Sequence, residues 1–248
     1  MIECDNKYFE SLDFEKYKQS RQKKARFIEQ ILRSFQQDSE VIVDIGGGTG
    51  LIARELSEKW NKEVIVLDRD IGLLRETCNQ VTSIAGDILN LPLKSNSVDM
   101  FIINHVWEHI GDQKTAMNEI AGSLSKNGII YLTLGNRAWI IEPHFKLPFL
   151  SILPKKIANF YLSLFIKGQN YDNINFPFPW QLYNTVFQEG LEWEDITYKV
   201  LMENHGILEK KWWKLTGRLL SLIPERLAKP LLSLITPQWF LIGRKKGA

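Results

Sequence analysis

The sequence has 248 residues, of which 44% are hydrophobic, and its formal net charge is +2. This length and composition predict one globular domain over residues 1–248, and so small a net charge argues against nucleic acid as a partner. Two cysteines and four scattered histidines form no zinc-binding pattern, so we expect no metal site.

The first predicted elements are a helix and a buried strand. Apolar residues repeat at helical spacing from Phe27 to Phe35. Residues 41–45 then form an apolar run without polar alternation, which is typical of a strand buried on both faces. Glycines follow at alternate positions, and they allow a turn to approach a ligand closely. These glycines are Gly46, Gly48 and Gly50.

The acids beside this turn indicate which cofactor it binds. A second apolar run, residues 64–67, ends at Asp68, where a carboxylate can accept both hydroxyls of a ribose. A dinucleotide motif of the form Gly-x-Gly-x-x-Gly would need a third glycine at Leu51. Asp44 would repel a pyrophosphate, but it suits an ammonium and a sulfonium. S-adenosylmethionine carries both groups, so the sequence favours it over NAD.

Three further motifs follow in chain order. They are Ala85-Gly86-Asp87-Ile88, the stretch from Leu89 to Met100, and Phe101-Ile102-Ile103-Asn104-His105-Val106-Trp107-Glu108-His109-Ile110. With the glycine turn and Asp68, they resemble the class I S-adenosylmethionine-dependent methyltransferases, and among these the group that includes the quinone-biosynthesis methyltransferases. The resemblance covers roughly residues 25–135.

This resemblance implies a set of cofactor-binding residues. They are Asp44, Gly46, Gly48, Gly50, Asp68, Asp87, Ile88 and Asn104. The glycines would line the methionine moiety, Asp44 would orient its amino group, and Asp68 would hold the ribose. Asp87 and Ile88 would contact the adenine, while Asn104 would close the pocket beneath the sulfonium. A turn or helix-capping aspartate is the alternative for Asp87.

Alternating strands and helices predict the α/β class, with a doubly wound, Rossmann-like sheet. The core spans about residues 25–136. Residues 129–134 would form a fifth strand, residues 191–201 the next, and residues 239–244 the last. Family resemblance implies seven strands that are mostly parallel, with an antiparallel last strand and an α-helical cap insertion.

Two insertions lie outside this minimal fold. Residues 137–180 are rich in proline and aromatic residues, and we interpret them as a substrate-binding cap, with an ordinary packing elaboration as the alternative. Residues 203–236 include a basic amphipathic helix at 208–222. This helix would either lie on an anionic membrane or, as we favour, pack on the cap. No apolar run is long enough to cross a membrane, so we expect a cytoplasmic protein with peripheral membrane contact as an alternative.

Methyl transfer to oxygen sometimes needs a base, and histidine suits that role at neutral pH. His109 and His144 are the candidate catalytic residues, followed by His105, with a structural role open for each. Asn104 and Asn136 stand where metal-dependent relatives carry acids, which argues against magnesium.

We therefore expect methyl transfer from S-adenosylmethionine to a small-molecule or lipid- or glycan-linked acceptor, through oxygen in preference to carbon or nitrogen. A catalytically silent binding or scaffold protein that keeps the cofactor fold is the alternative.

Overall fold

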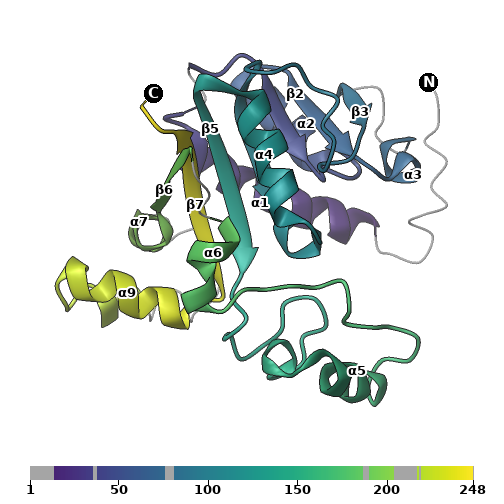
Figure 1. Cartoon of the computed structure of the whole chain (residues 1–248), viewed down its shortest axis with the longest axis vertical. Helices are drawn as coiled ribbons and strands as arrows, with labels where there is room; N and C mark the ends of the chain where they lie inside the picture. The colour runs from purple at the N-terminus through teal and green to yellow at the C-terminus, as the bar shows by residue number, and fades with distance from the viewer. Residues whose placement is uncertain are drawn as a thin grey trace. The chain divides into compact units, whose positions relative to one another are not determined.

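The structure is a computed structural model, shown in Figure 1, and it describes residues 14–35, 38–75, 81–186, 190–203, 217 and 219–247. The chain divides into two compact units. Unit 1 comprises Met1–Ile103, Asn118–Tyr131 and Arg244–Ala248, and unit 2 comprises Asn104–Met117 and Leu132–Gly243. A single domain with a core at 25–136 and cap insertions at 137–180 and 203–236 stays a prediction.

The strands form one seven-stranded sheet in the order β3-β2-β1-β4-β5-β7-β6. They are β1 (Ile42–Ile45), β2 (Val64–Asp68), β3 (Ser83–Ala85), β4 (Val98–Asn104), β5 (Leu124–Gly135), β6 (Leu191–Asp195) and β7 (Gln238–Lys245). The sheet is mostly parallel, with antiparallel last strands. The predicted fold class is therefore confirmed.

In unit 1, β1 lies between two parallel neighbours. Ile45 at its carboxyl end is paired with Leu67 of β2 and with Ile103 of β4. All four residues of β1 are buried, as expected for a strand covered on both faces. The carboxyl ends of these three strands consequently meet at one edge of the sheet, where ligands of open α/β sheets bind.

Of the described helices of unit 1, one precedes β1 and the others follow the glycine turn. They are α1 (Phe14–Leu32), α2 (Leu51–Trp60) and α3 (Ile71–Arg75), while α4 (Gln113–Ser123) precedes β5. α1 buries Ala25, Ile28 and Leu32 at helical spacing. It is also tied to α2, because the Gln22 amide donates a 2.7 Å hydrogen bond to Glu55.

The predicted strand at 191–201 is wrong in its second half. β6 ends at Asp195, and Thr197–Glu203 form helix α7. The side chain of Asp195 accepts a hydrogen bond from the backbone N–H of Thr197, which caps the helix start. The buried residues Thr197, Val200 and Leu201 recur at helical spacing, which distinguishes this stretch from a strand. The predicted last strand, 239–244, lies within β7.

In unit 2, residues 137–180 fold around a small core of their own. They contain the 3-10 turn η3 (Leu150–Ile152), helix α5 (Lys155–Ser163) and the start of the 3-10 turn η4 (Pro179–Gln181), which leads into α6 (Leu182–Val186). The core consists of Leu150, Ala158, Leu162, Tyr171, Ile174 and Phe176. The Lys155 ammonium donates to the backbone carbonyls of Tyr171, Asp172 and Ile174, which fixes the loop after α5. The function of this segment as a substrate cap stays a prediction.

The second insertion contains α9 (Glu225–Ile235), which packs with α7 through Leu201, Leu220, Ala228 and Leu232. The predicted basic amphipathic helix at 208–222 lies largely outside the described residues. At its end, Leu219 and Leu222 are exposed. Among the residues that the structure describes, no helix is long and apolar enough to span a bilayer.

Candidate functional site

The turn between β1 and α2 depends on its glycines. Gly46, Gly48 and Gly50 have φ angles of 66°, 56° and 69°, in the left-handed region that residues with a Cβ rarely adopt. Gly47 has a different constraint, since a Cβ there would lie 2.8 Å from Oδ2 of Asp44 and 2.9 Å from Cγ1 of Val66. Sequence reasoning missed Gly47, because its spacing fits no motif.

Asp68, the last residue of β2, is joined to this turn. Its Oδ2 accepts a 2.9 Å hydrogen bond from the backbone N–H of Gly48. Its Oδ1 accepts one of the same length from the N–H of Asp70. Each carboxylate oxygen has a second lone pair, so the side chain can still accept from the hydroxyls of a ribose.

Asp44 is a buried carboxylate whose Oδ2 has no hydrogen-bond partner among the described residues. Burial raises its pKa to about 7, repulsion from Asp68 adds to this, and the charge of Arg21 opposes it. An oxygen buried in this way fits a cationic ligand group, which would supply the missing donor.

Arg21 of α1 is a further residue of this site that sequence reasoning missed. Its Nε is buried and has no hydrogen-bond partner within the described part of the chain. Its guanidinium lies 4.7 Å from the centre of the Tyr17 ring. The sequence offered no signal for Arg21, because a single arginine in a basic helix is ordinary.

Asp87 and Ile88 follow β3 and are linked to Asp68 through the neighbouring glycine. The backbone N–H of Gly86 donates to the carbonyl of Asp68 over 3.1 Å. The Asp87 side chain accepts from the N–H of Leu89 and its carbonyl from the N–H of Asn90. Asp87 therefore shapes a turn, and its predicted contact with adenine stays untested.

Asn104 ends β4 and belongs to unit 2. Its Oδ1 accepts a 3.0 Å hydrogen bond from the hydroxyl of Thr133, which is fully buried. The same hydroxyl oxygen accepts from the backbone N–H of His105. His105 has a φ of 58°, a strained conformation for a residue with a side chain. The hydrogen bonds to Thr133 hold it there.

Unit 2 brings the two predicted catalytic histidines together. The ring centres of His109 and His144 lie 5.3 Å apart, at nearly right angles. Nδ1 of His144 donates to Oε1 of the buried Glu142 over 2.8 Å. Nδ1 of His109 donates to the carbonyl of Asn173 over 3.2 Å. Both rings therefore have Nε2 as the nitrogen left for other partners.

A buried acid, Glu108, belongs to the same cluster. Its side chain is fully buried, and Nδ1 of His105 lies 3.4 Å from its Oε1. Burial raises the pKa of Glu108, but its interaction with His105 and the charge of His109 outweigh burial and leave the pKa below its ordinary value. His109 and His144 are far apart in the sequence, but the 3-10 turn η2 (Trp107–His109) and the loop at 142–147 bring them together in the fold.

Aromatic residues lie beside this cluster. The ring of Phe176 is centred 5.6 Å from that of His144. It lies against Gly135 at the end of β5, where a Cβ would come within 2.4 Å of the ring. The absence of a Cβ at Gly135 therefore leaves room for the Phe176 ring beside His144.

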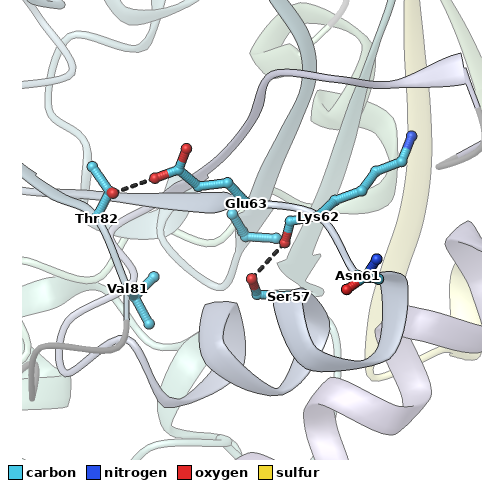
Figure 2. Close-up of a pocket in the computed structure, with 7 residues that line it drawn as sticks. Ser57, Asn61, Lys62, Glu63, Val81 and Thr82 are labelled. Carbon is cyan, nitrogen blue, oxygen red and sulfur yellow. Dashed lines mark hydrogen bonds between the residues drawn. The ribbon is translucent and has the colours of Figure 1, made fainter.

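A separate hollow of about 650 Å³ lies in unit 1, and it is lined by Ser57, Asn61, Lys62, Glu63, Val64, Val81 and Thr82. Figure 2 shows its polar side chains, including Glu63, which accepts a hydrogen bond from Thr82. Most of these residues immediately precede β2 or β3, and Val64 is the first residue of β2, so the hollow lies at the amino ends of these strands. The glycine turn follows the carboxyl end of β1, and none of the predicted cofactor residues lines the hollow.

Comparisons with known proteins identify the fold and the family. Residues 43–132 match the family model described as a methyltransferase domain. This stretch contains the glycine turn, Asp68, Asp87 and Asn104. It is a class I S-adenosylmethionine-dependent methyltransferase domain, and its cofactor is S-adenosylmethionine. The prediction of both is confirmed.

The curated relatives share this part of the chain. A demethylmenaquinone methyltransferase of Corynebacterium kroppenstedtii is 34% identical over 36% of this chain and 39% of its own length. A malonyl-[acyl-carrier protein] O-methyltransferase of Xylella fastidiosa is 30% identical over 41% of this chain and 37% of its own length. The matches thus span less than half of these relatives.

A solved structure is similar over nearly the whole chain. The plantazolicin methyltransferase BpumL, in complex with SAH, has a TM-score of 0.59 at 15% identity, over 97% of this chain and 93% of its own. Identity at this level establishes the shared fold.

Proposed function

We propose that the protein transfers the methyl group of S-adenosylmethionine to an oxygen atom of a small-molecule or lipid- or glycan-linked acceptor. The observation that carries this proposal is the pair of histidines, His109 and His144, whose Nδ1 atoms are both held by acceptors. Their Nε2 atoms are therefore available to accept a proton. An acceptor hydroxyl is a poor nucleophile until it loses its proton, so a base beside it favours transfer to oxygen.

The residues of unit 1 would hold the cofactor by its charged and polar groups. Asp44 would accept from the ammonium, because its Oδ2 is buried and has no described partner. Arg21 would pair with the carboxylate of the methionine moiety, since its Nε is likewise buried and unpartnered among the described residues. Asp68 would accept from the ribose hydroxyls beside the glycine turn.

The remaining cofactor contacts are proposed from the resemblance. Asp87 and Ile88 would contact the adenine, and Asn104 would lie beneath the sulfonium. When bound, the cofactor supplies an activated methyl group, so the protein need only align the acceptor and exclude water. Thr133 supports this by fixing the Asn104 side chain through a 3.0 Å hydrogen bond.

His144 is the better placed base of the two. Its Nδ1–H donates to Glu142, whose carboxylate would stabilise the imidazolium formed when Nε2 accepts the proton. Glu142 is itself held by the backbone N–H of Phe145, so the ring has a defined orientation. His109 is oriented by a neutral carbonyl, which stabilises the charged ring less.

The acceptor class is proposed from the surroundings of His144 and from the relatives. The buried Phe176 ring and the partly buried Phe145 make the surroundings of His144 aromatic and apolar, which suits an aromatic ring or an unsaturated chain. One relative is named for O-methylation of malonyl-[acyl-carrier protein] and another for methylation of demethylmenaquinone. Both names are compatible with the proposed acceptor class, a small molecule that is free or attached to a carrier.

The proposal is tested by incubating the full chain with methyl-labelled S-adenosylmethionine and a lipid extract of the native organism. Labelled product that releases methanol on ester cleavage, or that gives a methoxy fragment in mass spectrometry, identifies transfer to oxygen. Label found only on carbon or nitrogen would contradict O-methylation. Binding of S-adenosylmethionine without any transfer would favour the scaffold alternative.

We further propose peripheral membrane contact, and α5 favours it. Ile157, Phe160 and Leu164 recur at helical spacing and are more than half exposed. The exposed lysines Lys156 and Lys167 flank this stripe. An exposed apolar face bordered by basic residues suits the surface of an anionic bilayer. The helix at 208–222, for which membrane contact is the alternative to packing on the cap, lies mostly outside the described residues, so α5 gives the more direct test.

A further inference from the structure

We infer that Glu108, His109 and His144 form a binding site for a divalent transition metal ion of the zinc class. One ring nitrogen of each histidine and one carboxylate oxygen of Glu108 all lie within 4.8 Å of one another. These three residues, named here the Glu108 cluster, belong to unit 2.

The donor atoms of the Glu108 cluster are free for a metal. The Nδ1 atoms of His109 and His144 carry protons, because they donate to the Asn173 carbonyl and to Glu142. This leaves a lone pair on each Nε2. A metal-binding histidine typically donates its other N–H to a carboxylate or a backbone carbonyl, and both arrangements occur here.

Glu108 provides an independent observation that points to a cation. It is fully buried, and neither of its carboxylate oxygens has a hydrogen-bond partner of good geometry among the described residues. A carboxylate buried in this way is costly unless a cation compensates it, and the described contact to Oε1 is Nδ1 of His105 at 3.4 Å. A metal ion beside His109 and His144 would provide this compensation.

The ligand atoms of the Glu108 cluster are somewhat farther apart than in an occupied zinc site, and a small inward movement would bring them to the ion. Zinc binds histidine nitrogen at about 2.0–2.1 Å, so ligand atoms of a tetrahedral site lie roughly 3.3–3.4 Å apart. The present spread of up to 4.8 Å requires inward movement of roughly 1 to 1.5 Å. His109 and His144 are exposed and can make this movement by small side-chain rotations, while Glu108 is fixed in the interior.

The ligand types select the metal. Two imidazoles and one carboxylate suit zinc, cobalt or ferrous iron, whereas magnesium and calcium prefer oxygen ligands alone. Three protein ligands leave coordination positions open, as in catalytic sites. A bound metal would occupy the Nε2 atoms that the proposed base uses, so metal binding and a histidine base are alternative states of one cluster.

The test measures binding, and its result does not depend on methyl transfer. The full chain, with Cys4→Ser and Cys78→Ser to remove thiol ligands, is treated with a chelator and titrated calorimetrically with Zn²⁺. We expect one equivalent to bind. In His109→Ala, His144→Ala and Glu108→Gln the affinity should fall by more than about 100-fold, and in Glu142→Gln by about 10- to 100-fold, the effect of an outer-shell partner.

Glu192→Gln is the matched control, because Glu192 is an exposed acid of β6 outside the cluster. It should bind zinc like the parent, and magnesium at the same concentration should not bind. Thermal unfolding of each variant shows whether it folds, and His109→Asn and His144→Asn repeat the test with polar replacements. Absence of one-to-one zinc binding, or equal binding by the parent and the folded cluster variants, would overturn the inference.

Discussion

The carboxylate of Asp68 accepts a hydrogen bond from the backbone N–H of Gly48, with 2.9 Å between Oδ2 and the nitrogen. This bond joins the end of β2 to the turn that follows β1. Asp68 therefore has two functions: it shapes the glycine turn and it offers lone pairs to a ligand. A substitution that removes the carboxylate should affect both.

We expect Asp68→Ala to weaken binding of S-adenosylmethionine by about 1.5 to 3 kcal/mol, which is about 10- to 150-fold. The reason is that the ribose hydroxyls would lose their hydrogen-bond acceptor and the glycine turn would lose its hydrogen bond from Gly48 to Asp68. Calorimetric titration measures this loss. Glu63→Ala, at the opposite end of β2, serves as the control. Equal affinity in both variants, or tight binding of NAD by the parent without binding of S-adenosylmethionine, would contradict the assigned site.

Gly47→Ala should impair the same turn for a steric reason. The new Cβ would lie 2.8 Å from Oδ2 of Asp44 and 2.9 Å from Cγ1 of Val66, closer than such contacts allow. We expect a stability loss of about 1 to 3 kcal/mol and weaker cofactor binding. Gly122→Ala in α4 is the matched control, since nothing lies within 4 Å of its Cβ position. That change should leave binding intact and stabilise the helix by roughly 0.5 to 1 kcal/mol.

Asp44 should make the stability of the protein depend on pH. Its folded pKa is raised to about 7 from an ordinary value of 3.8, mainly by burial. Between pH 4 and 7 the unfolded chain ionises this acid while the folded protein keeps it protonated. Stability should therefore fall as pH rises through this window, by on the order of a few kcal/mol. Urea denaturation at several pH values should show that the stability of Asp44→Asn depends less on pH than that of the parent. If the two proteins lose stability in parallel as pH rises, Asp44 is not the cause.

Cofactor binding should have the opposite pH dependence. Ionised Asp44 attracts the ammonium of S-adenosylmethionine, so affinity should rise between about pH 6 and 7.5, by up to about 10-fold per pH unit. The α-amino group stays mostly protonated over this range. Titrations of the parent and of Asp44→Asn in the same buffers measure the effect. An Asp44→Asn variant with the parent's affinity and pH profile would show that this carboxylate does not contact the cofactor.

His144→Ala or His109→Ala should slow transfer with little effect on cofactor affinity. A general base contributes about 10²- to 10⁴-fold, so the loss should appear in turnover. Glu142→Gln should lower turnover less and shift the pH profile, because it orients His144 through the 2.8 Å hydrogen bond. Lys126→Ala, a change at an exposed lysine of β5 in unit 1, is the control. Full activity in both histidine variants would mean that alignment alone suffices and that neither ring accepts the proton.

Vesicle binding tests the exposed apolar face of α5. The full chain should co-sediment with anionic vesicles and dissociate in high salt, because each basic residue near such a surface contributes about 1 kcal/mol. Phe160→Asp/Leu164→Asp should abolish binding. Ser163→Asp adds a charge on the same helix at an exposed residue that is not apolar, and it should weaken binding only slightly. Equal binding by both variants, or none by the parent, would contradict membrane contact through α5.

The cofactor half of the fold could be predicted because its signals are local. The buried run at 41–45, the alternating glycines and Asp68 each follow from backbone requirements within a few residues. The prediction of a strand over 191–201 was wrong in its second half. Thr197, Val200 and Leu201 are buried at helical spacing, but this spacing is hard to recognise in so short an apolar stretch. Even there, the sequence held a signal, because aspartate is preferred at helix starts and Asp195 lies two residues before Thr197. In the structure its side chain accepts a hydrogen bond from the backbone N–H of Thr197.

The histidine cluster could be predicted only in part. His109 and His144 were identifiable as candidates, but they are 35 residues apart in sequence and their contact depends on how the loop at 142–147 folds. Glu142 lies two residues before His144, which was a weak signal for their pairing. Arg21 lies in a helix before the first strand, and nothing in its neighbours distinguishes it from the surrounding basic residues.

The contact between Gly135 and Phe176 has a consequence for which acceptors fit. With 2.4 Å between the ring and the position of a Cβ, the aromatic side chain rests on bare main chain. Its place is set by the end of β5. If acceptors bind beside His144, as proposed, the Phe176 ring would give them a boundary that is fixed by the main chain. A size limit set in this way by the backbone would persist through most changes to the surrounding side chains.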